Sequence, residues 1–263
     1  MHSTLLRLIS ILCALPLCAA AADTGFLNRT VTVEGVPYRF QVYVPADWTP
    51  QQSWPVALFL HGYGESGDDG LLQTQIGIAT AIRTHAAVLK LIVVMPQCRK
   101  GKLWVDPDMQ AQALAALEQA VTEFHGDPAR LYLTGLSMGG YGSWEMAIHH
   151  PGKFAALVPI CGGVQPNKHL PDLHSSFVND PKTSDPYAEI AKRIGSVPVW
   201  IFHGDADESV PVDESRKMNQ ALVAAKANVR YSEYPGVGHN SWDKAYSEPE
   251  FIPWLLAQKL PQK

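Results

Sequence analysis

The segment at residues 130–151, RLYLTGLSMGGYGSWEMAIHHP, constrains the fold more than any other part of this chain. Residues 131–133 form a short apolar run that is typical of a buried parallel strand. A helical pattern follows Ser137 and ends at Pro151. Between strand and helix, residues 135–139 form the motif G-x-S-x-G, with glycine two residues before and two residues after the serine. We therefore predict a buried strand, a sharp turn that presents Ser137 in strained backbone angles, and a helix.

Strand-like and helix-like patterns alternate along the rest of the sequence. A β-hairpin is expected at 29–44, strands at 55–60, 91–95, 131–134, 154–160, 197–202 and 229–234, and helices at 71–89, 108–124, 138–151, 187–194, 213–225 and 250–260. This alternation predicts the α/β class, with a mostly parallel central sheet flanked by helices on both faces. Residues 162–185 are too many for an ordinary connection, so we expect a short lid or substrate-binding insertion there.

The first 22 residues have the composition of a secretory signal peptide. A basic residue precedes an apolar stretch, and Ala20-Ala21-Ala22 fits a small-residue cleavage site. We therefore expect cleavage after Ala22, a single domain at 23–263, and a secreted or periplasmic protein. No later stretch is apolar for long enough to span a bilayer, so no stable membrane insertion is expected.

The charge of the chain bears on its partners, and its cysteines bear on whether it contains a disulfide. The formal net charge is −4 and no basic run is present, which argues against a nucleic-acid partner. Beyond the signal peptide only Cys98 and Cys161 remain, and they form either a disulfide or two buried free thiols. No pattern in the sequence predicts the oligomeric state.

A serine hydroxyl needs a neighbouring base, which a carboxylate holds in turn. After a serine in such a turn, the acid and then the histidine follow, each just past the end of a strand. Four histidines come after the helix that Ser137 starts: His169, His174, His203 and His239. The first two lie in the insertion, and the third precedes the acid and is expected to pack or to hydrogen-bond in a turn. We predict that His239, which follows the last strand, is the base.

Two aspartates compete for the role of the acid. The strand at 197–202 runs into residues 203–207, HGDAD, which contain Asp205 and Asp207. Asp205 lies directly in the turn, where a hydrogen bond to the local backbone is the ordinary use of an aspartate. Asp207 lies further out and can reach a histidine on the neighbouring loop, so we favour Asp207 and keep Asp205 as the alternative.

Cleavage of an acyl bond also requires donors for the oxyanion that develops on the substrate. One donor is expected to be the backbone N–H of Met138, the residue after the serine. The second is expected from the loop after the strand at 55–60, at Tyr63, because the glycines on both sides of Tyr63 let its amide turn towards the site.

Six motifs together resemble one branch of a known superfamily. HGYGESGDD, PQCRKGKLW, GLSMGGYGSWEMAIHHP, ICGG, HGDADESVPVDESR and GVGHNSW are similar to motifs of the predicted peptidase/esterase branch of the α/β-hydrolases. That branch resembles feruloyl esterases, polyhydroxybutyrate-depolymerase-like esterases and dienelactone hydrolase-like proteins. The resemblance extends from about residue 56 to the C-terminus. It implies Ser137, Asp207 and His239 as catalytic residues, and neither a metal nor an organic cofactor.

The expected activity is that of a secreted serine carboxylesterase that forms an acyl-enzyme. A peptidase acting on short peptides is the alternative, but the peptidase label in this branch rests on similarity to prolyl oligopeptidases, whose propeller domain this sequence does not show. A non-catalytic binding protein on the same fold is a third reading, and such proteins usually lose a member of the Ser, Asp and His set.

Aromatic residues suggest the kind of substrate. Tyr63, Trp104, Tyr141 and Trp242 are expected to rim Ser137, and flat rings suit stacking on aromatic or sugar rings. Trp104 and Trp242 either line such a pocket or pack the loops that hold the site. We expect a small-molecule or polysaccharide-linked ester as substrate, with a short-chain or hydroxycinnamoyl acyl group.

Overall fold

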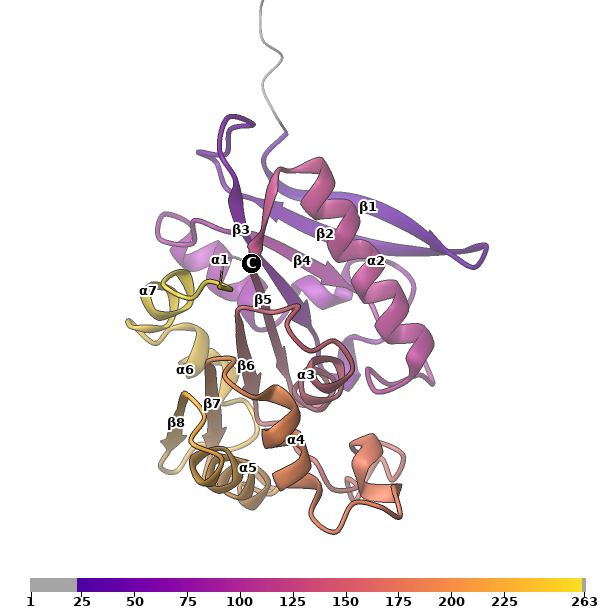
Figure 1. Ribbon diagram of the computed structural model, residues 1–263. Helices are drawn as coiled ribbons and strands as arrows, with labels where there is room; N and C mark the ends of the chain where they lie inside the picture. Colours follow the sequence, from indigo (N-terminus) through magenta and orange to yellow (C-terminus); the bar gives the residue numbers. More distant parts are fainter. Residues whose placement is uncertain (1–22, 262–263) are drawn as a thin grey trace, which may run out of the picture.

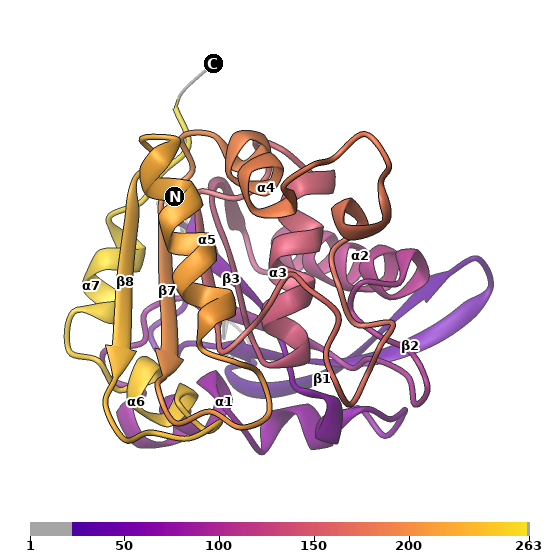
Figure 2. The same ribbon diagram turned by 90° about the horizontal axis from the view of Figure 1, so that it is seen from below.

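The computed structural model describes residues 23–261, and the predicted signal peptide at 1–22 lies outside the described residues. Eight strands form one sheet in the order β1-β2-β4-β3-β5-β6-β7-β8. The sheet is parallel from β4 to β8, and only the pairs β1–β2 and β2–β4 are antiparallel. Helices cover both faces of the sheet (Figures 1 and 2), so the predicted fold class is confirmed.

The elements have the following bounds. The strands are β1 (Gly25–Val33), β2 (Val36–Val44), β3 (Trp54–Leu60), β4 (Ile92–Pro96), β5 (Gly126–Leu136), β6 (Ala156–Ile160), β7 (Val199–Gly204) and β8 (Val229–Tyr234). The α-helices are α1 (Ile78–His85), α2 (Pro107–Glu123), α3 (Met138–His149), α4 (Pro186–Ile194), α5 (Asp213–Ala224), α6 (Trp242–Tyr246) and α7 (Phe251–Leu256). Short 3₁₀ turns lie at Tyr63–Glu65, Leu72–Thr74 and Ser176–Asn179.

Two apolar layers hold the helices against the sheet. All seven residues of β3 are buried, as expected for a strand in the middle of a sheet that is covered on both faces. One layer packs side chains of α2, α3, α4 and α5 against the sheet, and the other packs those of α1, α6 and α7. Since the parallel strands end at one common edge, the loops after β3, β5, β7 and β8 meet there.

The hairpin predicted at 29–44 is confirmed. Strands β1 and β2 pair from Gly25↔Val44 to Val33↔Val36. Both residues of the turn between them have positive φ, 49° at Glu34 and 80° at Gly35. That geometry matches the right-handed twist of the two strands and is the usual reason for glycine in a two-residue hairpin turn.

Two predicted helical segments are wrong in extent, and one short helix was not predicted. The helix expected at 71–89 is interrupted, and α1 begins only at Ile78, because Gly77 has φ 62° and cannot continue a helix. The closing helix expected at 250–260 covers only Phe251–Leu256. Helix α6 was not predicted, since its five residues are too few to show a periodic pattern.

None of the helices within residues 23–261 combines the length and the apolar composition needed to cross a membrane.

Candidate active site

Ser137 lies in the turn that joins β5 to α3. Its backbone angles are φ 52° and ψ −117°, which a residue with a side chain rarely adopts. Neighbouring backbone holds it there: the Ser137 N–H donates to the carbonyl oxygen of Ile160 at 2.9 Å, and its own carbonyl accepts from Gly140 N at 2.8 Å. The strained turn that the sequence predicted is therefore present, and it is fixed by β6 and by the first turn of α3.

Close backbone contacts explain why glycine is required on both sides of the serine. A Cβ atom on Gly135 would lie 2.2 Å from the carbonyl oxygen of Gly139. A Cβ atom on Gly139 would lie only 1.9 Å from the carbonyl oxygen of Leu60, at the end of β3. The motif therefore lets α3 begin directly against two strand ends.

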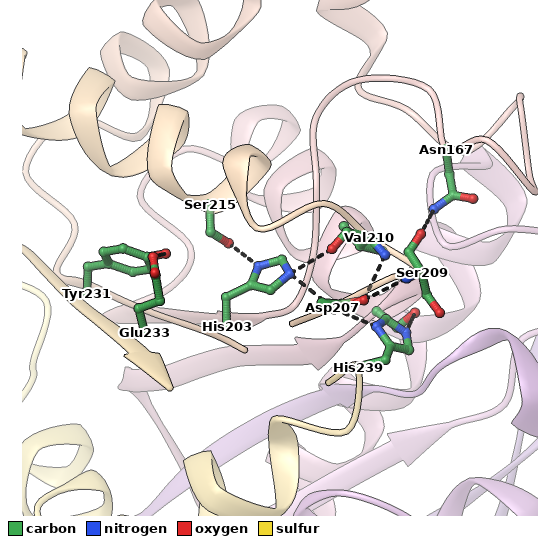
Figure 3. Close-up of polar contacts among 10 residues, drawn as sticks. Asn167, His203, Asp207, Ser209, Val210, Ser215, Tyr231, Glu233 and His239 are labelled. Atoms are coloured by element: carbon green, nitrogen blue, oxygen red, sulfur yellow. Dashed lines mark hydrogen bonds and ion pairs between the residues drawn. The ribbon is translucent and has the colours of Figure 1, made fainter. Parts of the chain in front are cut away.

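The side chains of Ser137, His239 and Asp207 form a continuous hydrogen-bonded chain. His239, in the loop after β8, places Nε2 2.8 Å from Ser137 Oγ. Its Nδ1 lies 2.7 Å from Oδ2 of Asp207, which follows β7 (Figure 3). Since an ionised carboxylate only accepts, Nδ1 carries the proton and Nε2 is left to accept from the serine hydroxyl. This is the arrangement in which an imidazole can act as a general base.

The side chain of Asp207 has no exposed surface, and each of its carboxylate oxygens accepts more than one hydrogen bond. Oδ1 accepts the backbone N–H groups of Ser209 at 2.8 Å and Val210 at 2.9 Å, and Oδ2 faces His239 and His203. Burial by itself would raise the pKa of Asp207. The hydrogen bonds from His203, His239 and Val210 outweigh burial, so the pKa lies well below its usual range and the carboxylate stays charged.

Asp205, the alternative acid, has a different partner. Its Oδ1 accepts the backbone N–H of Gly236 at 2.6 Å, which ties the loop after β7 to the loop after β8. The described structure gives it no hydrogen bond to His239. Asp205 thus stabilises the turn, whereas Asp207 contacts the histidine.

The two predicted oxyanion donors lie at the start of helical turns. Met138 is the first residue of α3, and Tyr63 is the first residue of a 3₁₀ turn. Within residues 23–261, neither backbone N–H donates to a protein acceptor. A Cβ atom on Gly62 would lie 3.9 Å from Ser137 Cβ, so the loop that carries Tyr63 lies directly against the serine.

The two tryptophans have different environments. Trp104 is fully buried, donates Nε1–H to the carbonyl oxygen of His61 at 3.0 Å and packs edge-on against the His61 ring. This corrects the expectation that Trp104 lines a substrate pocket, because a side chain inside the core supports the loop instead. Trp242 is half-buried, and its ring packs edge-on against His239 with the centroids 5.4 Å apart. Tyr63, 46% exposed, is the most open of these aromatic side chains.

Cys98 and Cys161 are two buried free thiols, which decides between the two states left open by the sequence. Burial raises the pKa of both thiols. Cys161 lies close to the site: its sulfur and ligand atoms of Asp207 and His239 are within 4.8 Å of one another. A metal ion there would have to take Asp207 away from His239 and deprotonate a buried thiol, so this cluster does not fit a metal ligand set.

Buried carboxylates on two helices hold the insertion at 162–185. Glu214 on α5 accepts the backbone N–H groups of Val164 at 2.7 Å and Gln165 at 3.0 Å. Glu145 on α3 accepts from Ser175 Oγ and from Ser176 N, both at 3.0 Å. The start and the middle of the insertion are therefore fixed to the helical layer. Neither glutamate was predicted from the sequence, although an acidic residue inside the apolar run GSWEMAI was a usable signal for Glu145.

The insertion also touches the loop of the acid. Asn167 donates through Nδ2 to the carbonyl oxygen of Ser209 at 3.0 Å, and the N–H of Ser209 binds Asp207 (Figure 3). The two histidines of the insertion make local contacts: His174 Nδ1 contacts the carbonyl oxygen of Ser175, and the His169 backbone N–H donates to Oδ1 of Asn167.

Comparison with known proteins gives one family match. Residues 107–256 match the sequence profile of the prolyl oligopeptidase family. A putative carboxymethylenebutenolidase of Escherichia coli O157:H7 is 32% identical over 148 residues, covering 55% of this chain and 49% of that protein. Poly(3-hydroxyalkanoate) depolymerase C of Paucimonas lemoignei is 28% identical over 246 residues, covering 83% of this chain and 57% of that protein.

Among solved structures, the crystal structure of a thermostable esterase is similar with a TM-score of 0.73 and 31% identity. The alignment covers 89% of this chain and 63% of that one. This chain spans about half the length of the carboxymethylenebutenolidase and of the depolymerase named above.

Proposed function

The chain belongs to the prolyl oligopeptidase family, and we propose that it is a serine carboxylic-ester hydrolase of the α/β-hydrolase superfamily. The family match and the relatives confirm the superfamily resemblance drawn from the motifs. The observation that carries the proposal is the unbroken chain of hydrogen bonds from Ser137 Oγ through His239 to Asp207. The similarity to an esterase and to a polyester depolymerase supports ester cleavage.

The proposed reaction follows from this geometry. Ser137 Oγ attacks the ester carbonyl while His239 Nε2 takes the serine proton, and Asp207 stabilises the imidazolium. The carbonyl oxygen becomes an oxyanion, which accepts from the backbone N–H groups of Met138 and Tyr63. His239 then returns the proton to the departing alcohol, which leaves the acyl group on the serine. A water molecule, deprotonated by His239, then attacks the acyl carbonyl. The bond to Ser137 Oγ breaks, His239 returns the proton to the serine, and the acid is released.

The substrate class rests on the side chains at the mouth of the site. Tyr63 is exposed and Trp242 is half-buried against His239, so two aromatic surfaces border the serine. Such surfaces suit a short acyl group or a hydroxycinnamoyl ring on a small-molecule or polysaccharide-linked ester. The predicted signal peptide supports a secreted or periplasmic location, where such esters are met.

A peptidase is the second candidate, favoured by the name of the matched family. An amide has a poorer leaving group than an ester, so the same residues would act on it only if the leaving amine were positioned well enough to be protonated by His239. A paired assay separates the two: p-nitrophenyl acetate or methyl ferulate against p-nitroanilides of short peptides.

The proposal is tested on the chain from residue 23 onwards with a fluorophosphonate probe and with the paired substrates. We expect covalent labelling at Ser137, ester turnover, and weak or no amide cleavage. Ser137→Ala should abolish labelling and lower kcat by at least ~10³-fold. Unchanged turnover by Ser137→Ala would exclude Ser137 as the nucleophile, and a folded wild-type protein that is not labelled would favour the non-catalytic binding protein.

A further inference from the structure

We propose that His203 is a positioning residue for this reaction, a second histidine that holds Asp207 for His239. The inference rests on the proposed function. Oδ2 of Asp207 lies between two imidazoles, 2.7 Å from His239 Nδ1 and 3.2 Å from His203 Nε2 (Figure 3). His203 is the second-to-last residue of β7, four residues before the acid, and has no exposed surface. The buried imidazole therefore lies close to the end of its strand, with Nε2 against the carboxylate of Asp207.

The neighbours of His203 determine which of its nitrogens carries the proton. Nε2 faces two acceptors, Oδ2 of Asp207 and the carbonyl oxygen of Val210 at 3.0 Å. Neither of them can donate, so Nε2 must carry a hydrogen atom. Nδ1 lies 2.7 Å from the hydroxyl of Ser215 on α5. Helix α5 thereby fixes the ring orientation that directs the Nε2–H at Asp207, in the way that an outer partner fixes the tautomer of a metal-binding histidine.

The donor from His203 completes the hydrogen bonding of Asp207. Two backbone N–H groups bind Oδ1, and the two histidines bind Oδ2. With both oxygens held, the carboxylate cannot rotate away from His239. The extra donor also draws charge from Oδ2, which limits how strongly Asp207 binds the proton on His239. His203 thus acts on both the geometry and the basicity of the base.

Of the two carboxylates near His203, only that of Asp207 accepts a hydrogen bond from its ring. Glu233 on β8 lies opposite His203 in the β7–β8 register, and Figure 3 shows Tyr231 and Glu233 on that side of the ring. Glu233 is occupied by Arg216 at 2.6 Å and 2.9 Å and by the hydroxyl of Tyr231 at 2.5 Å. Glu233 makes no hydrogen bond to His203 within residues 23–261. The carboxylate that His203 contacts directly is therefore Asp207.

Two substitutions at His203 separate positioning from mere packing. His203→Leu keeps an apolar side chain but removes the donor, and His203→Gln replaces the ring with an amide N–H at about the position of Nε2. For p-nitrophenyl acetate we expect kcat to fall by roughly 10-fold or more in His203→Leu. The acid limb of the pH–rate profile should also move up by roughly 0.5–1 pH unit, because loss of the donor leaves more charge on Asp207 and so stabilises the imidazolium. His203→Gln should recover most of both effects. Val199→Ala, also on β7 but away from Asp207, should lower the melting temperature and leave the pH profile in place.

The proton on His239 Nδ1 gives a readout that does not require turnover. Its NMR signal, far downfield because of the bond to Asp207, should shift in His203→Leu and return towards the wild-type position in His203→Gln. If both variants keep the wild-type pH profile and NMR signal, or both lose activity equally with the acid limb unmoved, His203 only packs and the inference is wrong. An inactive, unlabelled wild-type protein would refute the proposed esterase instead, while the NMR shift would still decide the contact between His203 and Asp207.

Discussion

Asp205 and Asp207 lie two residues apart in one turn and bind different partners. Asp207 Oδ2 lies 2.7 Å from His239 Nδ1, whereas Asp205 Oδ1 accepts the backbone N–H of Gly236 at 2.6 Å. The first contact orients an imidazole, and the second joins two loops. Two aspartates thus have different roles, which depend on how far each one lies beyond the end of β7.

Substitution of each aspartate by asparagine should therefore give opposite results. Asp207→Asn presents an amide that favours the wrong tautomer of His239, so kcat should fall by roughly 10³–10⁴-fold with the fold intact. Asp205→Asn should keep kcat within about 3-fold and lose about 1 kcal/mol of unfolding free energy, because the Gly236 N–H keeps only a weaker, uncharged acceptor. Esterase kinetics and urea unfolding of both variants test this. The reverse pattern would make Asp205 the acid.

The lowered pKa of Asp207 also predicts how stability depends on pH. A carboxylate whose pKa is lower in the folded protein than in the unfolded chain stabilises the fold fully above its unfolded pKa, about 3.9. That contribution is lost as the pH falls below this value towards the folded pKa. The difference in unfolding free energy between wild type and Asp207→Asn should therefore be constant from pH 7 to about pH 5 and should shrink between about pH 4 and pH 2. Urea unfolding at each pH measures it, and a constant difference down to pH 2 would contradict the assignment.

Much of the fold and of the site followed from local patterns. Parallel strands read as continuous apolar runs, and their ends meet at one edge, so the order serine, acid, histidine at three strand ends predicted the contact among Ser137, Asp207 and His239. The choice of Asp207 over Asp205 used only the distance from the strand. The structure places these groups as the order and spacing indicated.

The rest depends on contacts between distant segments. The break before α1 follows from Gly77, where a Cβ atom would lie 2.7 Å from the side chain of Leu136, the last residue of β5. Trp104 shows no sequence signal of its burial, which depends on its contact with His61. The sequence does not show that His203 contacts Asp207, because that contact depends on how the loop after β7 folds back. Such relationships require the tertiary structure.

The contact between α3 and β3 predicts a sharp cost for one extra carbon atom. In Gly139→Ala the new Cβ atom would lie 1.9 Å from the carbonyl oxygen of Leu60, and backbone atoms cannot give way as a flexible side chain does. We expect a loss of roughly 3 kcal/mol or more, or failure to fold, from displacement of α3. Gly64→Ala is the matched control, since no atom lies within 4 Å of its Cβ position. It should change the unfolding free energy by less than about 0.5 kcal/mol. Equal effects of both substitutions on urea unfolding would contradict the close contact between Gly139 and Leu60.

The link between Glu214 and the insertion predicts a change in substrate binding. In Glu214→Leu the N–H groups of Val164 and Gln165 lose their buried acceptor, so residues 162–185 should detach from α5. Since Asn167 of this segment binds the loop of Asp207 through Ser209, KM should rise by roughly 10-fold, with a smaller change in kcat, and proteolysis within 162–185 should accelerate. Tyr187→Phe removes only the third contact of the carboxylate, the hydroxyl 2.9 Å from Oε1. It should keep KM within about 2-fold, because the two backbone N–H groups remain bound. Wild-type proteolysis and KM in Glu214→Leu would mean that the insertion is held by other contacts.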